Sequence, residues 1–518
     1  MTPERRPSMK QPKPAARASH VNFGTSVPAD ELPWPNRIGP VIRMPKLHVE
    51  TEERAMVTRF GGLAVAEQLC RRFGVAALID EHVEVLKIHN PYHESDHVLA
   101  QALNLYVGGT CLEDMMQLQH DEAVLRMVGA CRLPDPTTAG DFLRRFDTEL
   151  HPGALSGLRH ANDELQQRVW RKLSRQQRRR RKRQWCVIDV DGHVKELCGV
   201  QKEGADLSYN GKWSYQPFLV SMASTGECLA VRNRPGNLRS GDGAAEVVDE
   251  VLGWATEHFD KILVRGDSDF DRQDLREVIE HHDGYFAFVG RAHEGRPAQA
   301  VALGEEAYRP FFTRAERARQ GRQTERGYKP RRKKHNRRRQ RARERNYTER
   351  LQTKQWIAET TYQPPGQPNV YRLVIRRKLI EHRKGQVHLF DDYEYRWVIT
   401  NLPSDFSAED VIDHTYQRCD QENVIEQMGS GLAGWRMPVA EFDGNSAWLQ
   451  IARLAWNMGK WIAQLVLPDE VVRWEWKRFR LHYVLVAAQL IKRARQIWLR
   501  LMGARSTIDP LLLAFDSL

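Results

Sequence analysis

The stretch "KILVRGDSDFDR" (residues 261–272) joins a strand pattern to a cluster of carboxylates. Apolar residues dominate its first half, which is typical of a strand buried inside a sheet. Asp267, Asp269 and Asp271 then follow at every second position. Carboxylates crowded in this way repel one another unless a cation joins them. We therefore expect a cation site at the end of this strand, with Asp267 and Asp269 as candidate ligands and Asp271 capping the next helix.

The segments on either side of this stretch alternate between strand and helix patterns. Short apolar runs bounded by turn residues indicate strands, and longer runs with apolar residues three and four apart indicate helices. The expected order is three strands, a helix, a strand, a helix and a strand, at residues 184–190, 215–224, 228–234, 243–259, 261–266, 272–282 and 285–290. A mixed α/β sheet that begins with a meander is the ribonuclease-H-like (RNase H-like) arrangement, which we expect here.

The rest of the chain divides around this core. At 518 residues, the chain is too long for a single compact core. We expect an RNase H-like core interrupted by a basic insertion that contains strands, between a helical N-terminal domain and a helical C-terminal region. The expected divisions are a disordered tail (1–45), a helical domain ending in an Arg-rich segment (46–184), the first part of the core (185–299), the insertion (300–393), the second part of the core (394–465) and the C-terminal helices (466–518).

A long helix is expected in the second part of the core. It should begin near Ser407, where "SAED" resembles a capping box with aspartate in place of glutamate, and continue through "VIDHTYQRCDQENVIEQM" (411–428). Glu422 falls at the border of its apolar face, which is formed by Val411, Ile412, Thr415 and Cys419. The helix would thus bring a carboxylate to the sheet.

Basic residues outnumber acidic ones by 79 to 67, which gives a net charge of +12. Two dense blocks, 171–184 and 329–345, are either solvated segments or contacts for nucleic-acid phosphates. We favour phosphate contact and expect it from Arg178, Arg179, Arg180, Arg181, Arg331, Arg332, Lys333, Lys334, Arg337, Arg338 and Arg339.

The seven cysteines are scattered, without a CxxC pair, which argues against a disulfide framework or a zinc ribbon. No run of about 18 uncharged apolar residues suggests a membrane span. The basic, Pro-rich N-terminus lacks the apolar centre of a signal peptide. We therefore expect a cytoplasmic protein without a membrane partner.

The strand-end carboxylates occur twice. Asp189 and Asp191 lie two apart on a strand and so share a face, and Asp267 and Asp269 repeat the spacing. Together with Glu422 they offer the hard oxygen ligands that Mg²⁺ prefers, and two such ions would activate an attacking oxygen and stabilise a leaving oxygen in phosphodiester cleavage. A single aspartate at a strand end is more often a turn or cap residue, so the argument depends on the repeated pair and the helical glutamate.

Four segments, in this order, resemble the bacterial insertion-sequence transposases with a DDE active site. They are "VIDVDGHVKELCGVQKEGADLSYNGKWSYQPFLVSMASTGE" (187–227), "RNRPGN" (232–237), "ILVRGDSDF" (262–270) and "YQRCDQENVIEQM" (416–428). The sequence is most similar to the insertion-sequence thirteen-eighty group, which is allied to the IS-four superfamily, and the similarity spans roughly residues 50–465.

This resemblance implies an RNase H-like catalytic core and assigns residues by motif match. Asp191 matches the first catalytic aspartate, with Asp189 as the alternative because the motif carries both; Asp267 and Glu422 match the second and third carboxylates. Arg418 matches a phosphate-binding arginine. Tyr416 is one position late for the tyrosine of that motif, and Gly429 stands where a lysine is expected, so the terminal-phosphate contacts of those two positions are in doubt.

The resemblance also implies cleavage at transposon ends and joining of the freed 3′-OH to target DNA. The cofactor would be two Mg²⁺ ions, for which Mn²⁺ can substitute. The partners would be double-stranded DNA, as terminal inverted repeats and as target, and a second copy of the chain in a synaptic complex on the bacterial nucleoid. Two alternatives stay open: a domesticated DNA-binding protein without catalysis, and an RNase H-like nuclease without strand transfer.

Overall fold

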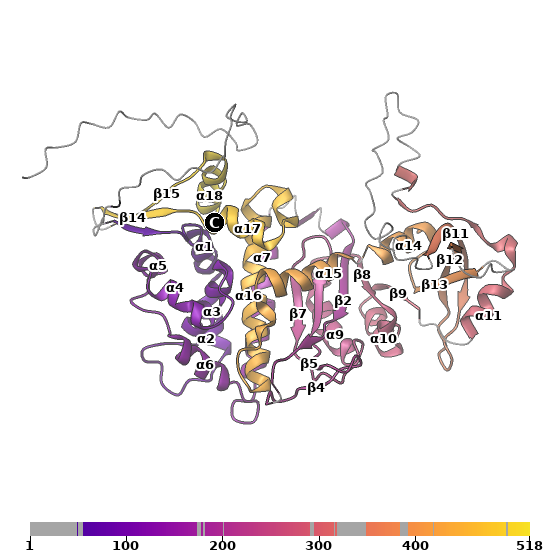
Figure 1. Cartoon of the computed structure of the whole chain (residues 1–518), viewed down its shortest axis with the longest axis horizontal. Coiled ribbons are helices and arrows are strands. Elements are labelled where there is room, and N and C mark those ends of the chain that lie inside the picture. Colours follow the sequence, from indigo (N-terminus) through magenta and orange to yellow (C-terminus); the bar gives the residue numbers. More distant parts are fainter. Residues whose placement is uncertain are drawn as a thin grey trace, which may run out of the picture.

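A computed structural model of the chain describes residues 49, 55–173, 178–179, 182–199, 201–290, 295–314, 316–318, 349–383, 392–417, 419–493 and 496–518. The expected disordered tail (1–45) lies outside these ranges. Figure 1 shows an elongated molecule with helices at one end, a sheet in the middle and long strands at the other end.

The central feature is a nine-stranded mixed sheet in the order β10-β11-β12-β13-β9-β8-β2-β6-β7. Strands β2 and β8 and strands β8 and β9 are parallel, and every other neighbouring pair is antiparallel. Five strands carry the expected pattern: β2 (Cys186–Gly192), β6 (Phe218–Met222), β7 (Cys228–Arg232), β8 (Ile262–Gly266) and β9 (Tyr285–Val289). With α9 (Ala244–Ala255) and α10 (Gln273–His281) they give the predicted order, so the mixed α/β sheet is confirmed.

The strands expected in the insertion extend this same sheet. They are β10 (Arg309–Pro310), β11 (Glu349–Tyr362) and β12 (Tyr371–Arg383), and β13 (Asp392–Thr400) joins them to β9 through the pairs Val398–Val289, Ile399–Phe288 and Thr400–Ala287. Helix α11 (Gly295–Ala302) and the short 3-10 helix η3 (Glu305–Ala307) precede them. A separate small sheet consists of β3 (Lys195–Glu196), β4 (Asp206–Leu207) and β5 (Trp213–Tyr215).

The N-terminal part is helical, as predicted. Its elements are α1 (Leu63–Phe73), α2 (Val75–His82), α3 (Glu94–Val107), η1 (Glu113–Met115), α4 (Met116–Gln119), α5 (Glu122–Met127), α6 (Pro136–Arg144) and α7 (Ala154–Lys172). Helix α16 (Phe442–Val466) contacts α1, α3, α6 and α7 on one side and β7 on the other. Trp448, Trp456 and Trp461 of α16 are all buried, so one apolar core joins the helices to the sheet.

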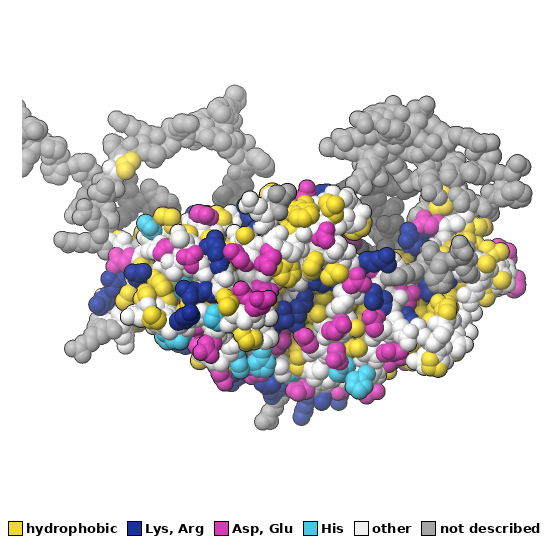
Figure 2. Space-filling view, turned by 90° about the horizontal axis from the view of Figure 1, so that it is seen from below, with side chains coloured by type: hydrophobic (Ala, Val, Ile, Leu, Met, Phe, Trp, Pro, Cys, Tyr) yellow, Lys and Arg dark blue, Asp and Glu magenta, His cyan; other side chains and the backbone are white. Residues whose placement is uncertain are grey.

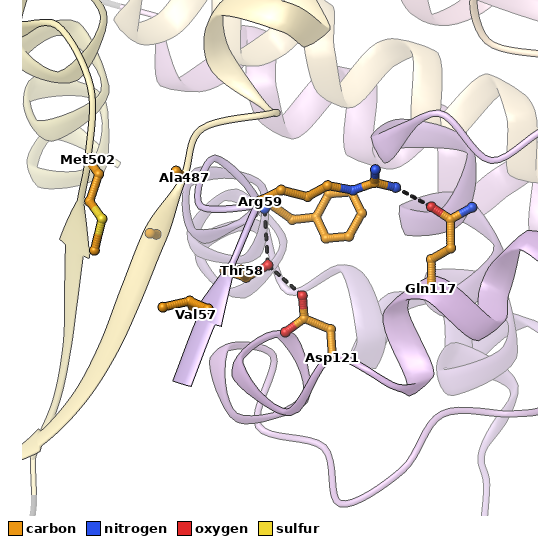
Figure 3. A pocket seen from close by; sticks show the side chains of 9 residues that line it. Val57, Thr58, Arg59, Gln117, Asp121, Ala487 and Met502 are labelled. Carbon is orange, nitrogen blue, oxygen red and sulfur yellow. Dashed lines mark hydrogen bonds between the residues drawn. The ribbon is translucent and has the colours of Figure 1, made fainter. Parts of the chain in front are cut away.

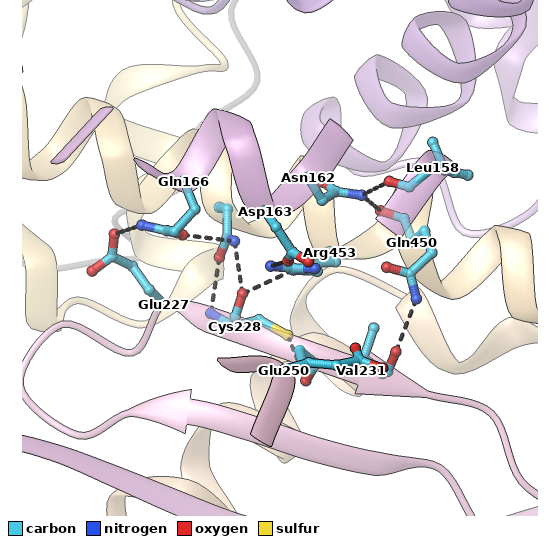
Figure 4. A network of polar contacts seen from close by, with 12 residues as sticks. Leu158, Asn162, Asp163, Gln166, Glu227, Cys228, Val231, Glu250, Gln450 and Arg453 are labelled. Carbon is cyan, nitrogen blue, oxygen red and sulfur yellow. Dashed lines mark hydrogen bonds and ion pairs between the residues drawn. The ribbon is translucent and has the colours of Figure 1, made fainter. Parts of the chain in front are cut away.

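Strand β7 ends the sheet, and polar side chains of α16 cover its free edge (Figure 4). Asn457 accepts from the backbone N–H of Cys228 at 2.9 Å and donates to its carbonyl at 2.8 Å. Arg453 donates to the same carbonyl at 3.1 Å, and Gln450 donates to the carbonyl of Val231 at 2.9 Å. An uncovered edge strand is a template for pairing with another chain, and these contacts remove that template.

The predicted C-terminal helices are wrong in part. Helices α17 (Trp476–Tyr483) and α18 (Arg505–Ser517) are present, but a hairpin of β14 (Ala488–Arg493) and β15 (Gln496–Leu501) lies between them. Strand β14 pairs with β1 (Met56–Thr58), from the other end of the chain, and the two strands line a cavity of about 510 Å³ (Figure 3). Pairing with a distant strand outweighs the local helix preference here. A short window of sequence does not contain that distant strand and therefore does not predict the pairing.

Two helices replace the long one expected after Ser407. Helix α14 (Ala408–Tyr416) begins as predicted, because Ser407 accepts a hydrogen bond from the backbone N–H of Asp410 at 3.1 Å. It ends at Gln417, and α15 (Cys419–Glu426) follows, continued by the π-helix η4 (Gln427–Gly431). The short 3-10 helices η5 (Gly434–Arg436) and η6 (Asp469–Arg473) lie on either side of α16 in the sequence.

Replacing Ser407 with alanine should destabilise the protein by about 1 kcal/mol, because the first turn of α14 loses its side-chain cap. Urea unfolding of the full chain measures this difference. Ser404→Ala, in the exposed turn just before the helix, is the matched control and should change stability by less than about 0.5 kcal/mol. Equal stability of the two variants would contradict the capping role.

Two expectations from the sequence concern membrane spans and disulfides. None of the described helices combines the length and apolarity needed to cross a membrane. The six cysteines whose side chains are described, Cys70, Cys111, Cys131, Cys186, Cys198 and Cys228, are all free thiols.

Candidate active site

Strands β2 and β8 are neighbours, and each carries a predicted carboxylate at or just beyond its C-terminal end. The strands run parallel, with Asp189 level with Arg265. Asp191 is the last residue but one of β2, and Asp267 directly follows the last residue of β8. Both residues are partly exposed. Two adjacent parallel strands therefore each end near an aspartate, and the joint role of Asp191 and Asp267 stays a prediction.

Asp189 has a different environment from Asp191. Its side chain is fully buried, and both of its oxygens accept from Arg265, from Nε at 2.7 Å and from Nη2 at 2.8 Å. Arg265 also donates to the carbonyl of His414, at the end of α14. This bidentate pair ties β2, β8 and α14 together and engages both oxygens of Asp189.

The other aspartates after β8 have separate roles. Asp267 caps the 3-10 helix η2 (Ser268–Phe270) by accepting from the backbone N–H of Asp269 at 2.9 Å. Asp269 is partly exposed and lines a cavity of about 620 Å³. The prediction that Asp271 caps α10 is wrong: the cap position is Arg272, and Asp271 forms buried ion pairs with Arg276 and Arg296. These arginines supply the opposite charge that its burial requires.

Glu422 lies on α15, which packs against β2 and β6. Its neighbour Gln421 is buried and donates to the carbonyl of Leu219 at 3.2 Å, while Ser221 donates to Gln421. Leu219 is the residue of β6 that pairs with Asp191. Gln421 therefore fixes this turn of α15 beside Asp191, and Glu422, one position on, is exposed.

The three carboxylates suit a hard divalent cation in their chemistry, because carboxylate oxygens are the ligands of Mg²⁺. Their ligating atoms do not all lie within 4.8 Å of one another: among the described residues, the group that meets this limit is His89, His93 and Glu94. Asp191 and Asp267 are placed by two strands of the sheet, whereas Glu422 is placed by helix α15. Among the described residues, these three carboxylates do not form a closed set of ligand atoms within 4.8 Å of one another.

Two histidines flank the carboxylates without adding positive charge. Burial, and then the nearby Lys195, lowers the pKa of His193 to about 4. Burial, and then Arg265, lowers the pKa of His414 below its ordinary value. His193 packs against Trp435 with ring centroids 5.4 Å apart. With its pKa near 4, His193 is neutral at pH 7, and the lowered pKa of His414 favours its neutral form as well.

The predicted DNA contacts divide between described and undescribed residues. Arg178 and Arg179 are exposed, and Tyr416 is partly buried beneath the Arg376 guanidinium, 4.0 Å from the ring centroid. Tyr416 also lines a cavity of about 680 Å³ that contains Arg314, Lys460 and Arg473. Ten predicted contacts lie outside the described residues: Arg180, Arg181, Arg331, Arg332, Lys333, Lys334, Arg337, Arg338, Arg339 and Arg418.

On the face drawn in Figure 2, the basic side chains of the described residues do not form a single patch. Basic and acidic side chains alternate there, with apolar ones between them. The dense basic block 329–345 lies outside the described part of the chain.

Sequence reasoning missed Arg265 and Gln421. Arg265 carried a signal, since a charged residue inside a buried strand is almost always paired. Gln421 carried none, because its two hydrogen bonds reach a strand about two hundred positions earlier in the chain.

Comparison with known proteins gives one strong match. The sequence profile of the family described as "Transposase DDE domain group 1" matches residues 40–518. Among solved structures, the cryo-EM structure of a piggyBac transposase synaptic complex with hairpin DNA is similar with a TM-score of 0.36 and 8% identity, over 83% of this chain and 82% of that chain. No protein of curated function matches. From the family profile, which covers most of its length, the chain belongs to the transposases of DDE domain group 1.

Proposed function

We propose that this protein is a DNA transposase that cleaves transposon ends and joins the freed 3′-OH to target DNA. The observation that carries this proposal is the pair of carboxylates at the ends of adjacent parallel strands, Asp191 and Asp267, in a chain that belongs to a DDE transposase family. Within that family we assign it to the bacterial insertion-sequence thirteen-eighty group of the IS-four superfamily, on the motifs quoted above.

In the proposed site, Asp191, Asp267 and Glu422 are the metal ligands and catalytic carboxylates. Bound Mg²⁺, or Mn²⁺ in its place, would supply a Lewis acid that activates the attacking oxygen and stabilises the leaving oxygen. Asp191 is preferred to Asp189 as the first ligand, because Arg265 already engages both oxygens of Asp189. Asp269, beside the cavity next to η2, is retained as a further candidate ligand.

The DNA is proposed to follow the basic residues around α14 and α15. Arg418, Tyr416 and the basic side chains of the adjoining cavity would contact backbone phosphates, and the Arg blocks would add sequence-independent affinity. We further propose that the N-terminal helices bind the terminal repeats, that the insertion grips phosphates, and that two copies of the chain act together in a synaptic complex on nucleoid DNA in the cytoplasm.

The decisive experiment incubates the full chain with DNA that carries the element's two ends, with Mg²⁺ or with EDTA. We expect Mg²⁺-dependent cleavage at the ends and joined products with added target DNA. Cleavage without joining would favour the nuclease, and binding with no nicking under Mg²⁺ or Mn²⁺ would favour the non-catalytic DNA-binding protein. Either result would overturn the proposal.

A further inference from the structure

Three potential metal ligands meet far from the strand-end carboxylates, in the N-terminal helices. His89, His93 and Glu94 have ligating atoms that all lie within 4.8 Å of one another. They come from the loop between α2 and α3 and from the first residue of α3. Their spacing in the sequence, four residues and then one, places two imidazoles and a carboxylate at one corner of the protein.

Glu94 is held as a metal ligand would be. Its side chain is 2% exposed, and its Oε1 accepts from the backbone N–H groups of Val85 at 3.1 Å and Leu86 at 3.0 Å. Its Oε2 faces His89 Nε2 at 3.1 Å. Burial opposes ionisation of Glu94, but the hydrogen bonds from Leu86 and Val85 outweigh it and hold the pKa below its ordinary value. The carboxylate is therefore a fixed anion that presents one oxygen to the histidines.

The histidines complete an arrangement that a simple ion pair does not require. One exposed imidazole would suffice to neutralise Glu94, yet a second, His93, lies parallel to His89 with ring centroids 4.9 Å apart. Two ligand atoms on a tetrahedral zinc ion, each about 2.0–2.1 Å from it, are about 3.3 Å apart, which is close to the His89–Glu94 separation. Both histidines are exposed, and His93 is also the N-cap residue of α3, so an ion held by it would lie at the start of that helix.

We propose that His89, His93 and Glu94 form a binding site for a divalent transition-metal ion, with zinc as the best fit. Two imidazole nitrogens and one carboxylate oxygen suit zinc, and the exposed side leaves the fourth position for water. The ion would fasten the loop to the start of α3, which packs against α16, and so stabilise the N-terminal helices. The site is independent of the proposed DNA chemistry.

Zinc binding to the full chain tests this site. Protein stripped with a chelator is titrated with Zn²⁺ in excess Mg²⁺, which occupies hard carboxylate sites, and bound zinc and Tm are measured. We expect the wild type to bind one more zinc ion per chain than His89→Ala or His93→Ala, and its Tm to rise with zinc while theirs does not. His120→Ala, an exposed histidine outside the cluster, should behave as the wild type.

Equal zinc binding and an equal rise in Tm for wild type and both variants would overturn the site. Far-UV circular dichroism checks that the variants are folded. Cobalt(II) gives a measurement that needs no variant: bound by these three ligands and water, it should show the visible absorption of a four-coordinate ion, and Zn²⁺ should displace it. A wild-type protein that binds no cobalt in this form would also reject the site.

Discussion

Asp191→Asn is expected to lower Mg²⁺-dependent cleavage of transposon ends by about 1,000-fold or more. The variant keeps the shape of the side chain but removes the negative charge, and a metal-bound oxygen contributes several kcal/mol to such a transition state. Asp191 is partly exposed at the end of β2, so stability should change by less than about 0.5 kcal/mol. The measurement is the single-turnover rate of end cleavage, with DNA binding and urea unfolding recorded on the same preparation.

Asp274→Asn is the matched control for this loss. Asp274 is an exposed aspartate in the first turn of α10 that pairs with Arg272 and accepts from the backbone N–H of Leu275 at 2.9 Å, a hydrogen bond that the asparagine oxygen can keep. Its variant should cleave at the wild-type rate. Asp267→Asn should match Asp191→Asn, because the asparagine side chain still caps η2 while the charge is lost. If Asp191→Asn cleaved at the rate of the control, Asp191 would not be a catalytic residue, and Asp189 would be assigned as the first carboxylate.

Asp189→Asn is expected to destabilise the protein by about 3 kcal/mol, because it leaves the buried Arg265 without its counter-charge. The Arg265 side chain is 3% exposed and has no access to water that would compensate. Urea or thermal unfolding of the full chain measures the loss. When cleavage is measured well below the lowered Tm, Asp189→Asn should keep a higher cleavage rate than Asp191→Asn, since Asp189 stabilises the strands and does not take part in the chemistry.

Two further variants sharpen this test. Asp141→Asn removes one charge of an exposed ion pair, in which the side chains of Arg144 and Asp141 are 48% and 61% exposed. The free energy of unfolding should fall by no more than about 1 kcal/mol. Combining Asp189→Leu with Arg265→Met removes both charges and should recover most of the stability, because an apolar pair of similar volume replaces a buried ion pair at little cost. A loss for Asp189→Asn as small as that for Asp141→Asn would contradict the structural role.

The sequence predicts the part of the candidate site that consists of carboxylates at strand ends. The alternation of Asp267, Asp269 and Asp271 after a buried strand predicted the end of β8, and the parallel register of β2 and β8 places Asp189 level with Arg265. The sequence could not separate Asp189 from Asp191, because both lie on the same expected strand and share one of its faces. Arg265, on the adjacent strand, distinguishes them by pairing with Asp189 alone.

Local sequence patterns predict the order of strands and helices in the core, the start of α14 and the helical N-terminal part, because these depend on residue periodicity and on caps within a few positions. Long-range contacts determine that strands from the insertion continue the sheet, that α16 covers the edge of β7, and that residues 488–501 form a hairpin that pairs with β1. Each of these depends on hydrogen bonds between segments far apart in the chain. The free energy of such pairing is absent from any local stretch, however clearly that stretch specifies its own helix or strand.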